Sequence, residues 1–276
     1  MGAQLLERED ADAAAIVQNA LLRDGVKLVL GCKLRAVTRE AAAKVLHWEA
    51  AGGTDSVAVD EILVAAGRAP NVEEIGLEAA GIAYQAGRGI AVDDRLRTAN
   101  PRIFAVGDCC MAWKFTHAAD AAAKIAVQNA LFFGRRKLSA LVMPWCTYTD
   151  PELAHVGLSE RDAAARGIAL RTFTVPLDAN DRAVCDGETE GFVRVHVKRG
   201  TDQPLGATVV ASHAGEMVSL LTTAITHRIG LGRLAGTIFP YPTQSEAVKA
   251  VANAYMRTRL TPTVKRIFER VLRAMR

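Results

Sequence analysis

Two continuous apolar segments constrain the fold more than any other feature of this sequence. DEILVAAG (60–67) and PRIFAVGD (101–108) run without the polar alternation of a half-exposed strand. Unbroken apolar strands are typical of parallel sheets that are covered on both faces. We therefore expect an α/β region in which both segments are buried strands.

The segments around these two add helices and an antiparallel element. Residues 11–23 predict a helix that ends at Asp24-Gly25, and VKLVL (26–30) predicts a buried strand. A long alanine-rich helix is expected over 116–133. Three short alternating segments predict a small antiparallel meander, and they are CKLRAV (32–37), AKVLHWEA (43–50) and TDSVAV (54–59).

The pattern is mixed α and β throughout, with a domain boundary expected near 142–146, and Pro144 opens a new stretch. Its expected strands lie near 153–157, 168–175, 191–197 and 204–210, and its expected helices near 159–166 and 214–229. A further helix starts near Thr243, and the break LTPT separates it from the last helical segment.

The stretch FPYPTQSE (239–246) has two interpretations. Thr243 and Glu246 have the T-x-x-E spacing of a capping box, in which the threonine oxygen accepts from a helix amide and the glutamate reaches back to the cap. Pro242 holds Tyr241 in an extended conformation. Capping does not explain Tyr241, so an acid–base pair of Tyr241 and Glu246 stays open as the alternative.

PRIFAVGD is the strongest candidate for a binding site. Gly107 permits close approach of the backbone to a ligand, and Asp108 would lie at the tip of a strand, where α/β sheets bind ligands. A helix begins eight residues later at Thr116-His117, and its first amides can face an anionic or carbonyl group. The alternative is that Gly-Asp forms an ordinary turn.

The cysteines and histidines favour no metal site or disulfide framework. The five cysteines are odd in number and irregularly spaced. The adjacent Cys109 and Cys110 are weak candidates for a soft-metal site or a strained disulfide, and we favour buried small residues instead. No H-x-x-x-H or H-E-x-x-H spacing occurs among the histidines.

The net charge of +4 is concentrated at the C-terminus. From Arg257 onward the sequence has seven cationic residues and one carboxylate, Glu269. Residues 263–276 predict a basic amphipathic helix. Docking of this helix on the protein's own body is favoured over contact with an anionic membrane surface. Aromatic residues do not interleave with the charges, so no nucleic-acid partner is expected. The opening GAQLLERED has no apolar core of a signal peptide, which favours a cytoplasmic protein.

Four segments, taken together and in this order, resemble one family. They are DEILVAAGRAPN (60–71), PRIFAVGD (101–108), CTYTDPELAHVGLSE (146–160) and FPYPTQSE (239–246). The family is that of the FAD-dependent pyridine nucleotide-disulfide oxidoreductases, which includes mercuric reductase and dihydrolipoamide dehydrogenase. The resemblance implies only the C-terminal portion of such a protein.

The resemblance also implies a domain division. Residues 1–66 would be a remnant of the NAD(P)-binding domain, and 67–141 the second segment of the FAD-binding domain. Residues 142–262 would form an α+β dimerisation (interface) domain that builds a homodimer, followed by the terminal helix 263–276.

The site residues implied by the resemblance fall in two places. Gly107 and Asp108 would hold the ribityl chain of FAD, with His117 and Ala118 near the flavin ring. Tyr241 stands where disulfide-reducing members have a catalytic histidine, and Glu246 matches the glutamate that orients it. The two would reach across the dimer into the partner's site. Tyrosine is a poor general base at neutral pH. A tyrosine in this segment resembles mercuric reductase more than the disulfide-reducing members.

The same resemblance implies hydride transfer from NAD(P)H through FAD to a dithiol or metal substrate. Family members also carry two dinucleotide fingerprints and a C-x-x-x-x-C pair, which this sequence lacks. GLGRLA (230–235) matches G-x-G-x-x-A, but it follows a predicted helix rather than a strand. We therefore expect no turnover by this chain alone, and an N-terminal half supplied by another chain stays open. The alternative is a non-catalytic dimerisation module or a truncated remnant.

Overall fold

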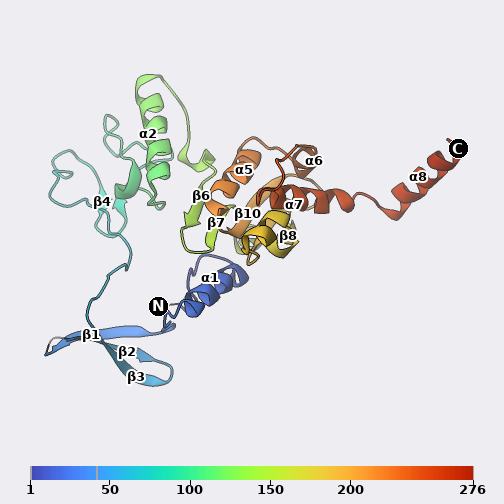
Figure 1. Cartoon of the computed structure of the whole chain (residues 1–276). Coiled ribbons are helices and arrows are strands. Elements are labelled where there is room, and N and C mark those ends of the chain that lie inside the picture. The colour runs from blue at the N-terminus through green and yellow to red at the C-terminus, as the bar shows by residue number, and fades with distance from the viewer. Residues whose placement is uncertain (1, 42, 276) are drawn as a thin grey trace. The chain divides into compact units, whose positions relative to one another are not determined.

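The structure is a computed structural model that describes residues 2–41 and 43–275 (Figure 1). The chain divides into two compact units, one formed by Met1–Glu61 with Val142–Arg276 and the other by Ile62–Leu141. The architecture is mixed α and β in both.

A five-stranded antiparallel sheet forms the centre of the first unit, in the order β6-β7-β10-β9-β8. The predicted strands of this region are confirmed, and β6 was not predicted because it is short and lacks alternation. The strands are β6 (Pro144–Thr147), β7 (Glu152–Gly157), β8 (Leu170–Pro176), β9 (Phe192–Lys198) and β10 (Pro204–Ala211).

Three helices cover one face of this sheet and bury the main core. On β9, Val193, Val195 and Val197 are fully buried on this side. Successive side chains of a strand point to opposite faces, so this alternation sets which side faces the helices. The helices are α5 (Ala214–Thr226), α6 (Leu231–Ala235) and α7 (Glu246–Arg257), while α3 (Glu160–Ala165) and α4 (Asp181–Asp186) are short connecting helices.

Helix α1 (Ala11–Arg23) packs against the opposite face of the same sheet. Its buried Ala13 and Val17 join Leu153, Phe192 and Val210 in one cluster. This contact places the helix predicted over 11–23 on the sheet of residues 144–211.

Three further strands precede the second unit and form the predicted antiparallel meander. They are β1 (Lys33–Glu40), β2 (Ala43–Ala50) and β3 (Gly53–Val59), paired in sequence order. The strand predicted over 26–30 is wrong, since this segment is irregular and Val26 and Val29 are exposed at 42% and 44%. No strand among the described residues pairs with it, and an unpaired segment is not held in the extended form.

The second unit packs a small core beside helix α2 (Thr116–Leu131), which confirms the long helix predicted over 116–133. The expected parallel strands are wrong. Segment 60–67 is irregular, with Leu63 93% exposed, and 101–108 holds one isolated bridge, between Phe104 and Arg97, before a 3₁₀ turn begins at Gly107. Among the described residues of this unit the only strands are β4 (Tyr84–Gln85) and β5 (Gly89–Ile90), so neither segment has a parallel neighbour.

The last helix, α8 (Pro262–Ala274), confirms the predicted amphipathic segment. None of its residues is buried, so the expected docking on the protein's own body is wrong. Across residues 2–41 and 43–275, none of the helices combines the length and the apolar character needed to span a bilayer.

Candidate functional site

The first candidate site is built around Gly107 and Asp108, which lie in the 3₁₀ turn η1 (Gly107–Cys109). Gly107 has φ +78°, and a Cβ there would lie 3.2 Å from the Cβ of Ala119. Glycine therefore allows this turn to lie directly against α2. The Asp108 side chain is 47% exposed, and one oxygen lies 3.4 Å from Nη1 of Arg68.

The start of α2 lies next to this turn in the same unit. Phe115 is the N-cap, and its ring stacks on that of His117 with centroids 5.2 Å apart. Ala118 is fully buried, whereas the preceding His117 is exposed. The first amides of a helix lie ahead of the helical hydrogen-bond pattern and favour electronegative groups.

The two cysteines beside Asp108 are hydrogen-bonded to nearby backbone carbonyls. Cys109 and Cys110 donate to the carbonyl oxygens of Val106 and Gly107 at 3.3 and 3.6 Å. Burial, with the adjacent Cys109 thiol, raises the pKa of Cys110 to about 12. Among the described residues no group of three or more His, Cys, Asp or Glu side chains is arranged to hold a metal ion. All five cysteines are free, and Cys185 on α4 is exposed.

The second candidate site contains Tyr241 and Glu246, which do not bond to each other. The Tyr241 hydroxyl is exposed and donates to Oδ2 of Asp181 at 3.1 Å, and this bond raises the pKa of Tyr241. Glu246 Oε2 accepts from the backbone N–H of Thr243 at 3.3 Å. Both side chains line an open pocket of about 290 Å³ between α4 and α7.

The capping box expected at Thr243 forms only in part. Glu246 reaches back to Thr243, as predicted, but the Thr243 hydroxyl donates to the carbonyl of Pro240 at 2.9 Å. The cap of α7 is Ser245, so the helix begins two residues later than that motif indicates. The threonine cap is wrong because α7 starts after Ser245, and the N–H of Glu246 donates to the backbone carbonyl of Thr243 instead of to its hydroxyl.

Gln244 anchors this turn, and sequence reasoning missed it. Its side chain is 6% exposed and lies between Ser212, at 2.8 Å, and Glu188, at 2.9 Å. Asn180 adds a bond from Nδ2 to the carbonyl of Thr243 at 3.1 Å. Its place between Thr243 and Glu246 of the expected capping box was the signal for Gln244 in the sequence.

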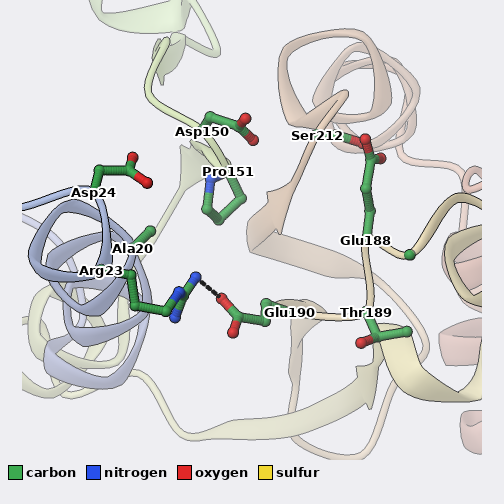
Figure 2. Close-up of a pocket in the computed structure, with 10 residues that line it drawn as sticks. Ala20, Arg23, Asp24, Asp150, Pro151, Glu188, Thr189, Glu190 and Ser212 are labelled. Carbon is green, nitrogen blue, oxygen red and sulfur yellow. Dashed lines mark hydrogen bonds and ion pairs between the residues drawn. The ribbon is translucent and has the colours of Figure 1, made fainter.

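Glu188 and Ser212 also line a second pocket, of about 330 Å³ (Figure 2). Its other wall is the end of α1, where Nη2 of Arg23 lies 2.5 Å from Oε2 of Glu190. Asp24 and Asp150 make the remaining lining acidic. This pocket lies beside the anchor of the 241–246 turn.

Two family models match this chain. The dimerisation domain of the pyridine nucleotide-disulphide oxidoreductases matches residues 143–252, and the pyridine nucleotide-disulphide oxidoreductase model matches residues 1–123. The chain belongs to the pyridine nucleotide-disulfide oxidoreductase family. The family is one of FAD-dependent disulfide and mercuric oxidoreductases whose members use FAD and NAD(P)H.

Similar proteins of known activity include mercuric reductases and a dihydrolipoyl dehydrogenase. The chain is 32% identical to mercuric reductase of Bacillus cereus, over 89% of this chain and 39% of that protein. For mercuric reductase of Streptomyces lividans the identity is 33%, over 91% of this chain and 53% of that protein. For dihydrolipoyl dehydrogenase of Thermus scotoductus it is 35%, over 91% and 54%. The chain thus spans about half the length of the curated relatives it matches.

Two solved structures have a similar fold. LpdA from Mycobacterium tuberculosis superposes with a TM-score of 0.83 at 31% identity, over 90% of this chain and 53% of that one. The HOCl-induced flavoprotein disulfide reductase RclA from Escherichia coli gives 0.83 at 27% identity, over 91% and 57%.

Proposed function

We propose that this chain supplies the dimerisation domain and the second FAD-domain segment of an FAD- and NAD(P)H-dependent oxidoreductase of the mercuric reductase or dihydrolipoamide dehydrogenase type. The observation that carries the proposal is the exposed carboxylate of Asp108, directly after Gly107 and beside the start of α2. The homodimer would form through residues 142–262. The sequence holds no C-x-x-x-x-C pair, so the redox dithiol would come from further polypeptide, attached or separate.

The residues around Asp108 fit a flavin. Among the described residues its carboxylate has a single side-chain partner, the long and exposed contact with Arg68, so its oxygens can accept from the hydroxyls of a ribityl chain. Gly107 leaves room at the turn, and the exposed His117 would present the helix start to the flavin ring, with the buried Ala118 next to it in the chain. When bound, FAD would carry the hydride between nicotinamide and the acceptor.

Tyr241 and Glu246 would serve different purposes in this proposal. With its pKa raised by Asp181, Tyr241 stays protonated at neutral pH and donates a hydrogen bond instead of accepting a proton. Glu246 holds the turn of residues 241–246 through the Thr243 amide. A phenol that stays neutral is a poor base for a dithiol, which disfavours thiol–disulfide exchange at this position.

A second candidate, a non-catalytic dimerisation module, is favoured by one observation. The five-stranded sheet with α5, α6 and α7 buries a continuous core of its own, drawn from residues 154–252. Such a core is what an independently folding domain needs.

Visible absorbance distinguishes the two candidates. The purified chain is incubated with excess FAD, desalted and scanned, beside Asp108→Ala and the control Asp120→Ala, whose carboxylate lies on α2 and pairs with Lys124. The oxidoreductase proposal expects a retained flavin band that Asp108→Ala loses and Asp120→Ala keeps. A folded dimer by sedimentation with no flavin band in any variant would support the module instead.

A further inference from the structure

Helix α8 leaves an apolar face uncovered. The large apolar side chains repeat with helical spacing along one side. Their exposed fractions are 54% for Ile267, 55% for Phe268, 48% for Val271, 60% for Leu272 and 78% for Met275.

The helix is a defined element outside the dimerisation domain. The family model of that domain ends at residue 252. At the start of α8 the Thr261 hydroxyl accepts from the Val264 amide at 3.3 Å, and Pro262 occupies the first turn. A helix of 13 residues is marginal in water on its own, so an apolar face of this kind calls for a surface that covers it.

The charge of α8 indicates which kind of surface would cover its apolar face. The polar side of α8 carries Lys265, Arg266, Arg270 and Arg273 against the single carboxylate of Glu269. A second copy of α8 would bring an equal excess of positive charge against it. Anionic lipid headgroups bring the opposite charge, and they lie directly above an apolar layer that accepts the other face of the helix.

We propose that α8 lies in the headgroup region of an anionic lipid bilayer, with Phe268 and Leu272 inserted and the arginines at the phosphates. The helix holds the protein at the membrane surface without crossing it. This inference does not depend on flavin binding, since no residue of α8 belongs to either candidate site.

Vesicle co-sedimentation of the full chain tests the proposal. We expect binding to vesicles of equal parts phosphatidylcholine and phosphatidylglycerol, little binding to phosphatidylcholine alone, and release at high salt because the charges are screened. Arg270→Gln lowers the partition coefficient about fivefold, and Phe268→Ser roughly tenfold. Binding that is equal on both vesicles, or absent from both, overturns the proposal.

Two controls test whether α8 itself is the membrane anchor. Ile238→Ser removes a 90% exposed apolar side chain elsewhere in the same unit, and it leaves binding unchanged if α8 is the anchor. Equal losses for Ile238→Ser and Phe268→Ser overturn the assignment to α8. Sedimentation without lipid tests the competing occupant, because a drop in oligomeric state on Phe268→Ser would mean that a second copy covers the helix.

Discussion

The hydroxyl of Tyr241 is held by a neighbouring carboxylate rather than by the glutamate of its own motif. Oδ2 of Asp181 accepts a hydrogen bond from this hydroxyl at 3.1 Å, which raises the pKa of the phenol. A carboxylate beside a phenol favours the neutral phenol over the phenolate. The sequence spacing suggested an acid–base pair with Glu246, but the partner of Tyr241 comes from a helix 60 residues away, and spacing within a motif carries no information about it.

Replacement of Asp181 therefore changes the titration of Tyr241. In Asp181→Asn the pKa of Tyr241 falls, because the charge that opposes ionisation is gone. Ultraviolet difference titration measures this shift, with Tyr241→Phe to assign the signal. Asp178→Asn, an exposed carboxylate with no bond to Tyr241, is the matched control. An unchanged titration in Asp181→Asn would contradict the hydrogen bond.

His196 has an unusual position for a titratable residue. It is fully buried, its Nδ1 lies 2.9 Å from Oγ1 of Thr172, and its Nε2 has no hydrogen-bond partner among the described residues. Burial lowers the pKa of His196, with Glu160 and Asp10 opposing in part. The unfolded chain then binds the proton more readily than the folded one.

Stability is therefore expected to fall as pH drops below about 6.5, the ordinary histidine pKa, and to be fully retained above it. His155, whose pKa burial also lowers, contributes with the same sign. His196→Gln gives a shallower dependence of Tm on pH in thermal unfolding, while the exposed His227→Gln keeps the slope of the parent chain. A steeper slope in His196→Gln would be inconsistent with a neutral buried imidazole.

At the scale of elements, the strand predictions were right for segments that pair with another strand of this chain. The alternation of β9, with its valines on one side and Arg194 and His196 on the other, was sufficient to predict it. Segments 26–30 and 60–67 have equally strong strand composition but no pairing neighbour among the described residues. Composition records the propensity for a strand, whereas the hydrogen bonds need a second segment.

The docking of α1 on the sheet was not predictable either, because the apolar cluster and the ion pairs that hold it join residues far apart in the sequence. Arg194 is 16% exposed and binds Asp10 at 3.1 Å and both oxygens of Asp12, which lowers the pKa of Asp12. Arg194→Gln is expected to weaken this docking by about 2 kcal/mol. Hydrogen exchange would then quicken in 11–23 and stay slow in α5. Arg171→Gln, on the neighbouring strand, is the control. Equal protection of α1 in both variants would contradict a stabilising role for the contacts of Arg194 with Asp10 and Asp12.

For the whole molecule, the division into two units leaves one connection exposed. Segment 62–66 leads from the meander into the second unit, with Leu63 and Val64 exposed at 93% and 79%. Exposed irregular backbone is where proteases cut first. Brief chymotrypsin treatment should therefore cleave after Leu63 and give a fragment whose N-terminal sequence begins at Val64. Leu63→Ser should remove that fragment, and preferential cleavage after the fully buried Leu153 would contradict the structure.

The exposed thiol of Cys185 makes the chain suited to fluorescence spectroscopy. The other four cysteines are buried or partly buried, so a maleimide dye at neutral pH has one readily accessible target. That target is on α4, the helix whose Asp181 binds Tyr241. A dye attached there would report by its emission when a second subunit or a small molecule covers the Tyr241 pocket, without any engineered label.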